Sequence, residues 1–138
     1  MCLSIAQARP NAVLTTGKHL GFEWQVIHNG MGFRCGYVKI PLGHPWYKKD
    51  YNDIEVDVHG GLTFTESDVL CEKSGPDDGW WIGFDCAHAD DKPDPMLPHE
   101  RDLGGFFRDG VVRTQSYVEN ECRRVCEQAK NAVSNDKD

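Results

Sequence analysis

The segment His59-Gly60-Gly61 places an imidazole beside two residues that have no side chain. Glycine adopts positive φ angles readily and lets backbone N–H groups approach a bound group closely. Gly60 and Gly61 are therefore candidates to cradle a phosphate or carboxylate, with His59 as hydrogen-bond donor or general acid–base. The structural alternative is a glycine bulge in a strand, with His59 at the surface.

A second polar group follows an apolar strand predicted over 80–86. Asp85 and His88 lie where the chain leaves the core. If the two strand ends are neighbours, His59, Asp85 and His88 form an open three-ligand site for a divalent metal such as zinc. Without a metal, Asp85 would orient the imidazole of His59 or His88 as a general base. Alternatively, Asp85 caps the turn that follows.

A loop between the predicted strands supplies the candidate ligand-binding residues His44, Trp46, Tyr47 and Lys48. Aromatic side chains stack on nucleic-acid bases, and a lysine can contact a phosphate. Trp81 joins this set as a tryptophan that can face a pocket. The alternative reading is a hydrophobic plug with solvated lysines, with Trp81 in the core.

The connection 87–110 is long for a compact domain and rich in acidic residues, which is typical of functional or mobile loops. Three arginines flank or lie within it and are candidates to contact an anion. They are Arg101, Arg108 and Arg113. Because the segment also carries many carboxylates, Asp91 among them, the simpler interpretation is solvated ion pairs that contribute little stability.

The elements that would position these residues are strands first and a helix last. Residues 20–27 and 33–40 flank Asn29-Gly30 and predict a hairpin, because Asn-Gly supplies the positive φ angles of a tight turn. Residues 54–58 alternate apolar and polar positions and predict a further strand. The strand over 80–86 is apolar on both faces, which favours a central position.

A single helix is expected at the end of the chain. Ser116 and Glu119 have the spacing of a capping box. Four small or apolar residues follow with the 4-3-4 spacing of a buried stripe. They are Val118, Cys122, Val125 and Ala129. The fold class predicted is α+β, a small antiparallel sheet with an N-terminal hairpin and a C-terminal packing helix.

Composition limits the classes of protein. A chain of 138 residues predicts one domain, placed here at 1–133 with a frayed tail at 134–138. A formal charge of −7 argues against a binder of duplex nucleic acid. No apolar run is long enough to cross a membrane. Six cysteines without a CxxC pair, and an N-terminus unlike a secretory signal, predict a cytoplasmic protein with reduced thiols.

Three segments resemble a family of small, uncharacterised proteins encoded by phages and prophages. They are GHPWYKKDYNDIEVDVHGGLTF at 43–64, WWIGFDCAH at 80–88 and SYVENECRRVCEQA at 116–129. The resemblance implies a phage gene product that acts inside a bacterial host cell. Small phage proteins often counter host defence, and some do so by trapping or cleaving nucleotide signals. This is an analogy of biology and not of chemistry.

Two functions follow as expectations. The first is capture of a phosphorylated small molecule, a nucleotide above all, with sequestration or hydrolysis by a His- and Asp-based phosphoesterase, metal-assisted or not. The second is an acidic protein-interaction module that inhibits a host enzyme, with carboxylates concentrated at 85–109. Partners to consider are therefore the small molecule, a host protein and a second copy of the chain.

Overall fold

The computed structural model describes residues 13–28, 32–67, 79–86, 91–92 and 111–136. One sheet has the strand order β1-β2-β3-β5-β4, and each neighbouring pair is antiparallel. Its strands are β1 (Val13–His19), β2 (Phe22–His28), β3 (Arg34–Pro41), β4 (Phe64–Ser67) and β5 (Gly79–Asp85). A short 3-10 helix, η2 (Tyr51–Asp53), lies between β3 and β4.

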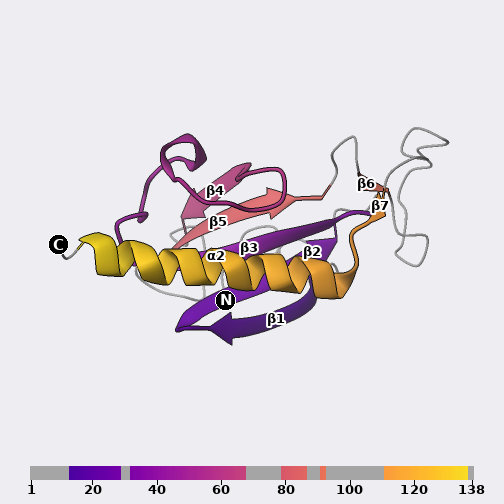
Figure 1. The fold of residues 1–138 in the computed structure, drawn as a ribbon, viewed down its shortest axis with the longest axis horizontal. Coiled ribbons are helices and arrows are strands. Elements are labelled where there is room, and N and C mark those ends of the chain that lie inside the picture. The colour runs from indigo at the N-terminus through magenta and orange to yellow at the C-terminus, as the bar shows by residue number, and fades with distance from the viewer. Residues whose placement is uncertain (1–12, 29–31, 68–78, 87–90, 93–110, 137–138) are drawn as a thin grey trace.

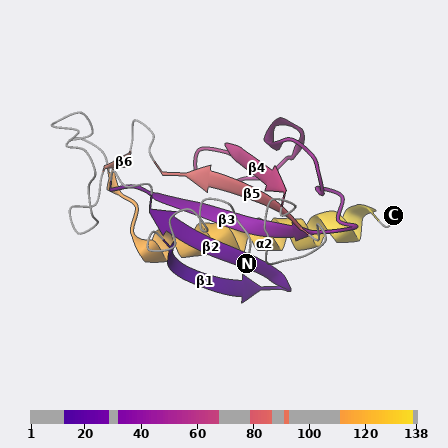
Figure 2. The same ribbon diagram turned by 180° about the vertical axis from the view of Figure 1, so that it is seen from behind.

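A single long helix, α2 (Gln115–Asp136), lies across one face of this sheet and gives the described fold two layers (Figures 1 and 2). Two short strands, β6 (Asp91–Lys92) and β7 (Val111–Val112), pair in parallel. Because β7 ends just before α2 begins, this pairing brings Asp91 to the N-terminal end of the helix (Figure 1). The predicted α+β class, with antiparallel strands and a C-terminal packing helix, is confirmed.

The predicted buried stripe of the helix is also confirmed. Val118, Cys122, Val125 and Ala129 have no exposed surface, and all belong to the core between the helix and the sheet. Their 4-3-4 spacing keeps them on one face because an α-helix repeats every 3.6 residues. The stripe therefore fixes which side of α2 meets the strands.

The predicted start of the helix needs correction. The helix begins at Gln115, and the backbone N–H of Tyr117 donates to Oγ1 of Thr114 at 3.2 Å. Thr114, not Ser116, is therefore the capping residue. The helix continues to Asp136, past the predicted tail boundary at 134, because no glycine or proline interrupts residues 115–136.

Alternation along the strands separates two cores. Val26, Val38 and Ile82 face the helix, whereas Tyr37 and Trp81 pack on the opposite face of the sheet. The helix packs closely over a glycine of β3. A Cβ atom at Gly36 would lie 2.4 Å from Cζ of Phe84 and 2.8 Å from Sγ of Cys122, so no larger residue fits there.

Two of the strand predictions agree with the structure. The predicted hairpin strands pair as β2 and β3, although the Asn29-Gly30 turn lies outside the described residues. The strand predicted over 80–86 is β5, with neighbours on both sides. Strand β1, which pairs with β2, was not predicted.

The strand predicted over 54–58 is wrong. Its backbone has no strand partner; instead the N–H of Asp57 donates to Oε1 of Gln128, and the carbonyl of Asp57 accepts from Nε2 of Gln128, at 2.7 and 2.8 Å. A helix side chain thus replaces the neighbouring strand that the alternation seemed to require.

Candidate functional site

The imidazole of His59 lies between a carboxylate and a phenol. Its Nε2 is 3.0 Å from Oδ2 of Asp91, and its Nδ1 is 2.8 Å from Oη of Tyr117. Only 12% of the His59 side chain is exposed. Three segments far apart in the sequence therefore meet at this ring: the turn after residue 58, strand β6 and the first turn of α2.

Asp91 is fully buried and carries a second partner. Nε of Arg113 donates to its Oδ1 at 2.7 Å, so each carboxylate oxygen has its own donor. A buried charge is tolerated when it is paired and hydrogen-bonded in this way. Hydrogen bonding to Asp91 raises the pKa of Arg113 above its ordinary value, which keeps the guanidinium charged. The interpretation of Asp91 and Arg113 as solvated, energetically minor charges is therefore wrong.

The contacts of His59 define its tautomer. An ionised Asp91 can only accept, so Nε2 carries the proton and Nδ1 accepts from Tyr117. Burial, followed by the charge of Glu121, raises the pKa of Tyr117, although Arg113 opposes the shift. The phenol therefore remains a donor at neutral pH. The resulting chain, Asp91–His59–Tyr117, can take a proton from the phenol while the carboxylate stabilises the imidazolium.

The segment that carries His59 is attached along one polar edge of α2. The backbone N–H of His59 donates to Oε1 of Glu121 at 2.9 Å. Arg124 bridges Oε2 of Glu121 and Oδ2 of Asp57, at 2.7 Å to each. With Gln128, these side chains form a ladder on successive turns of the helix. The ladder fixes the position from which the imidazole reaches Asp91.

The two glycines after His59 adopt the positive φ angles that the sequence predicts, 68° for Gly60 and 79° for Gly61. The N–H of Gly61 donates to the carbonyl of Val58 at 2.9 Å, so this donor closes a turn. Nothing lies within 4 Å of the position of an added Cβ on Gly61. The glycines therefore serve the turn that presents His59, and the N–H of Gly61 is not a donor for a ligand.

Arg113 is the group of this site best placed to meet an anion. Its guanidinium lies over the ring of Tyr117, 5.2 Å from the centroid, and its side chain is 23% exposed. Among the described residues, neither Nη1 nor Nη2 has a hydrogen-bond partner. Nε is held by Asp91, so the outer fork of the guanidinium is oriented before any ligand arrives.

Asp85 does not join His59. It lies directly opposite Cys35 in the register of β3 and β5, and so points to the sheet face away from α2. There its Oδ2 accepts from Oγ1 of Thr63 at 3.2 Å. His59, by contrast, contacts a residue of α2. The predicted partnership of His59 with Asp85 is replaced by one with Asp91, and His88 lies outside the described residues.

His44 is a structural histidine in this fold. Its Nε2 is 2.8 Å from the carbonyl oxygen of Ala129, and its Nδ1 accepts from the backbone N–H of Trp46 at 2.9 Å. The side chain is buried between the loop and α2. With both ring nitrogens bound to the backbone, His44 has no nitrogen left for a ligand, and its role is to attach the loop to the helix.

The other predicted ligand-binding residues are dispersed. Trp81 is fully buried in the core on the sheet face away from the helix, so it offers no surface to a ligand. Tyr47 packs against the core beneath α2. Lys48 is exposed, with φ of 61° and its Nζ 5.9 Å from the Tyr47 ring centroid. Trp46 lines an open hollow beside the end of the helix.

The described residues contain no group of three or more His, Cys, Asp or Glu side chains arranged to hold a metal ion. The predicted metal set cannot be assembled from them, because Asp85 and His59 face opposite sides of the sheet and His88 is outside the described ranges. The acidic segment 85–109 was predicted to form an interaction surface. Within it, the structure describes four residues: Asp85, Cys86, Asp91 and Lys92. Asp91 is buried and so takes no part in a surface.

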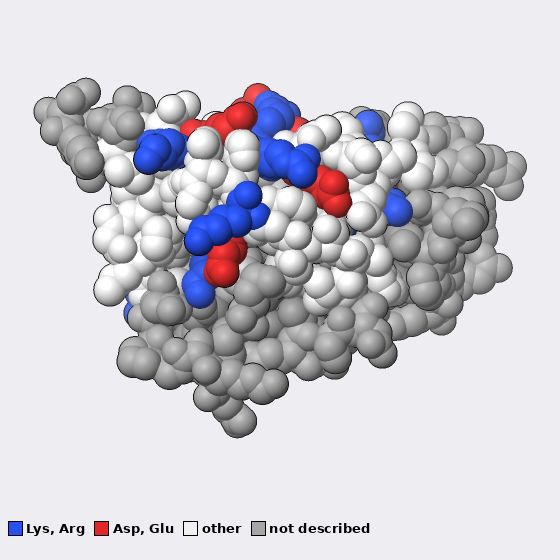
Figure 3. Space-filling view, turned by 90° about the horizontal axis from the view of Figure 1, so that it is seen from below, with Lys and Arg blue, Asp and Glu red and all other residues white. Residues whose placement is uncertain are grey.

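The surface seen from the β1 side carries charges of both signs. Lysine and arginine side chains lie next to aspartate and glutamate there, without a continuous patch of one sign among the described residues (Figure 3). In the part of the chain that the structure describes, no helix is both long and apolar enough to pass through a lipid bilayer.

Sequence reasoning missed two members of the site. They are Asp91, whose carboxylate accepts from Nε2 of His59, and Tyr117, whose phenol donates to Nδ1 of His59. Tyr117 carried one usable signal, since it lies next to the buried Val118 at the start of the helix and so on the edge of its apolar stripe. Asp91 gave none, because it is one acid among many in its segment.

The fold and the site together define a two-layer α+β protein with a carboxylate–imidazole–phenol chain beside an anchored arginine. Comparison of the chain with protein-family models, with curated proteins and with solved structures finds no match in any of the three.

Proposed function

We propose that this protein binds a phosphorylated small molecule, a nucleotide first, at the surface formed by Arg113 and Tyr117. The observation that carries the proposal is the anchoring of Arg113. A buried carboxylate fixes Nε, and none of the described residues bonds the outer fork of the guanidinium. A planar fork of this kind suits two oxygens of a phosphate group.

The same surface offers acid–base chemistry through Tyr117. In a hydrolytic reaction, water attacks phosphorus while its proton passes to Oη of Tyr117, and the phenol proton passes to Nδ1 of His59. Asp91 stabilises the imidazolium. The bond from phosphorus to the leaving oxygen breaks, and the proton held by His59 returns through Tyr117 to that oxygen. Capture without turnover needs the guanidinium fork of Arg113 and no proton transfer.

The resemblance to phage-encoded proteins makes a bacterial nucleotide signal the first ligand to test, and counter-defence the biological setting proposed. Native mass spectrometry of protein purified without chelator would report a co-purified nucleotide, a bound metal and the number of subunits in one measurement. Calorimetry with inorganic phosphate and with linear and cyclic nucleotides then gives affinities, and chromatography of the mixtures gives turnover.

Arg113→Lys is the decisive variant, because it keeps the positive charge and removes the fork. We expect its affinity for the ligand to fall about tenfold or more, the effect of losing a charge-assisted contact of about 1.4 kcal/mol. Arg123→Lys is the matched control, since Arg123, which lies in α2, also has its guanidinium over an aromatic ring, that of Trp24. Equal affinities for both variants, or no binding by the native chain, would refute the proposal.

Binding and hydrolysis separate in a second pair of variants. Tyr117→Phe and His59→Gln are expected to retain binding through Arg113 but to abolish turnover, if turnover occurs in the native protein. A native protein that binds without turnover assigns sequestration as the function.

A further inference from the structure

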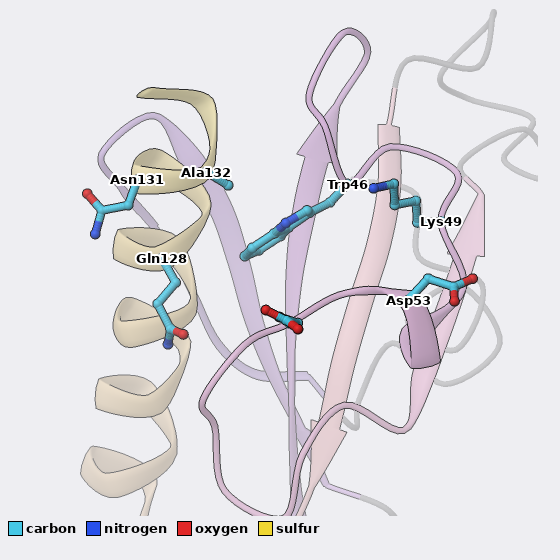
Figure 4. A pocket seen from close by; sticks show the side chains of 7 residues that line it. Trp46, Lys49, Asp53, Gln128, Asn131 and Ala132 are labelled. Atoms are coloured by element: carbon cyan, nitrogen blue, oxygen red, sulfur yellow. The ribbon is translucent and has the colours of Figure 1, made fainter. Parts of the chain in front are cut away.

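The open hollow that Trp46 lines lies toward the other end of α2 from the His59 site. It has a volume of about 600 Å³ and opens between the loop after β3 and the last turns of the helix (Figure 4). Trp46, Lys49, Asp53 and Glu55 line it from the loop side, and Asn131 from the helix. Asn131 is 14 residues beyond Tyr117, or roughly 21 Å along the helix axis at 1.5 Å per residue. The hollow is therefore separate from the His59 site.

The charges around this hollow are predominantly negative. Asp53 and Glu55 are both exposed, and within the described part of the chain their carboxylates make no ion pair and no hydrogen bond. Lys49 supplies one positive charge, and it forms no ion pair with either carboxylate. Two unpaired carboxylates against one ammonium group leave an excess negative charge at the rim.

The end of the helix adds to this potential. The backbone dipoles of α2 accumulate partial negative charge in its last turn, and Asn131 and Ala132, which border the hollow, lie five and four residues before its last residue, Asp136. The last turn of α2 carries no basic residue to offset it. Helix and loop thus contribute negative potential of the same sign to one space.

An aromatic wall completes the hollow. The indole of Trp46 extends from the loop toward α2 and lies between the loop and helix residues that line the space (Figure 4). Trp46 is held in place because its backbone N–H is bound to His44, which is in turn bound to the helix backbone. A fixed indole next to carboxylates is a common combination for a cation, which gains from both the charges and the ring.

We propose that this hollow binds a small organic cation, one that carries an alkylammonium or guanidinium group. Asp53 and Glu55 would pair with the cation, and Trp46 would contact its apolar carbons. A phosphate is disfavoured here because it would meet two carboxylates. The loop predicted to bind a nucleotide would thus bind the opposite charge.

The test is calorimetry on the full chain at constant ionic strength, with spermidine, arginine amide and inorganic phosphate as probes. We expect both cations to bind. Glu55→Gln should weaken their binding about threefold to tenfold, the range for one surface charge near a ligand. Lys49→Gln should strengthen it by a similar factor, because it removes the repelling charge.

Glu119→Gln is the matched control, because it removes one carboxylate from the opposite half of α2, where Glu119 bonds to Gln115. It should leave cation binding unchanged. Tighter binding of spermidine than of arginine amide would identify a free polyamine as the ligand type, and the reverse order a basic side chain.

Failure of both cations to bind at millimolar concentration would overturn the proposal. So would weaker cation binding by Lys49→Gln, or phosphate binding that Lys49→Gln abolishes. Arg113→Lys should change nucleotide affinity and leave spermidine affinity intact, so failure at one site is distinguishable from failure at the other.

Discussion

Nε2 of His59 lies 3.0 Å from Oδ2 of Asp91, although the two residues are 32 positions apart in the sequence. The carboxylate has no exposed surface, and Arg113 holds its other oxygen. The imidazole is therefore oriented from the interior of the protein, and its second nitrogen is directed to a phenol at the surface. Both the proposed chemistry and part of the stability of this end of the fold depend on this one carboxylate.

Asp91→Asn is expected to destabilise the protein by about 3 kcal/mol, because it removes one partner of a buried ion pair. Chemical denaturation at neutral pH would measure the change. Asp57→Asn is the control: the Asp57 side chain is 85% exposed, and its pair with Arg124 is a surface contact. Such pairs contribute about 0–1 kcal/mol. Similar losses for the two variants would contradict the structural importance of Asp91.

His44→Phe preserves an aromatic ring but removes the hydrogen bond from the loop to Ala129 of the helix and the one within the loop to the N–H of Trp46. Two lost bonds of about 1 kcal/mol each, with the buried N–H of Trp46 left unpaired, predict a loss of about 2–4 kcal/mol. Thermal unfolding followed by circular dichroism would detect it. His19→Phe should cost less, since the ring of His19 is partly exposed and its Nε2 lies 3.5 Å from a carboxylate oxygen of the exposed Glu127. The reverse order would show that His44 does not attach the loop.

Stability should fall in alkaline solution because of buried thiols. Burial raises the pKa of Cys126 from 9.0 to about 12, and that of Cys35 from 9.0 to about 12. Between these values the unfolded chain has lost protons that the folded chain retains, so the unfolding free energy decreases as pH rises. The slope is up to about 1.4 kcal/mol per pH unit for each thiol.

Urea unfolding in reducing buffer, below and above pH 9, would measure how the unfolding free energy changes with pH. Cys126→Ala should reduce the alkaline slope, since one titrating group is gone. Val125→Ala, at a neighbouring buried position without a proton to lose, should lower the stability equally at every pH. An alkaline slope that is the same in both variants would exclude Cys126 as a source of the effect.

Leu20→Asn should stabilise the protein by about 0.5–1 kcal/mol. Leu20 has φ of 54° in the turn between β1 and β2, and its side chain is 50% exposed. This conformation is costly for leucine and readily adopted by asparagine. Leu42→Asn is the control, because Leu42 is 68% exposed but is not among the residues with positive φ. Denaturant midpoints should rise for the first variant and stay near the native value for the second.

The local features of this protein could be predicted from its sequence alone. The spacing of Val118, Cys122, Val125 and Ala129 predicted the helix and its buried face, because 3.6-residue periodicity is a property of neighbouring positions. Gly60 and Gly61 predicted positive φ for the same local reason. The antiparallel pairing of β2 with β3 followed from two alternating segments around Asn29-Gly30.

The hydrogen-bond partner of each polar residue, by contrast, depends on the tertiary structure. Residues 54–58 alternate like a strand, yet the Gln128 amide takes the place of a neighbouring strand. Asp85 was the predicted partner of His59 because it lies at the end of an apolar strand. Strand alternation places its side chain on the sheet face away from His59. Asp91 reaches His59 through the pairing of β6 with β7. Such contacts join segments far apart in the chain, and no local pattern of residue types encodes which of many acids will be the one that is buried.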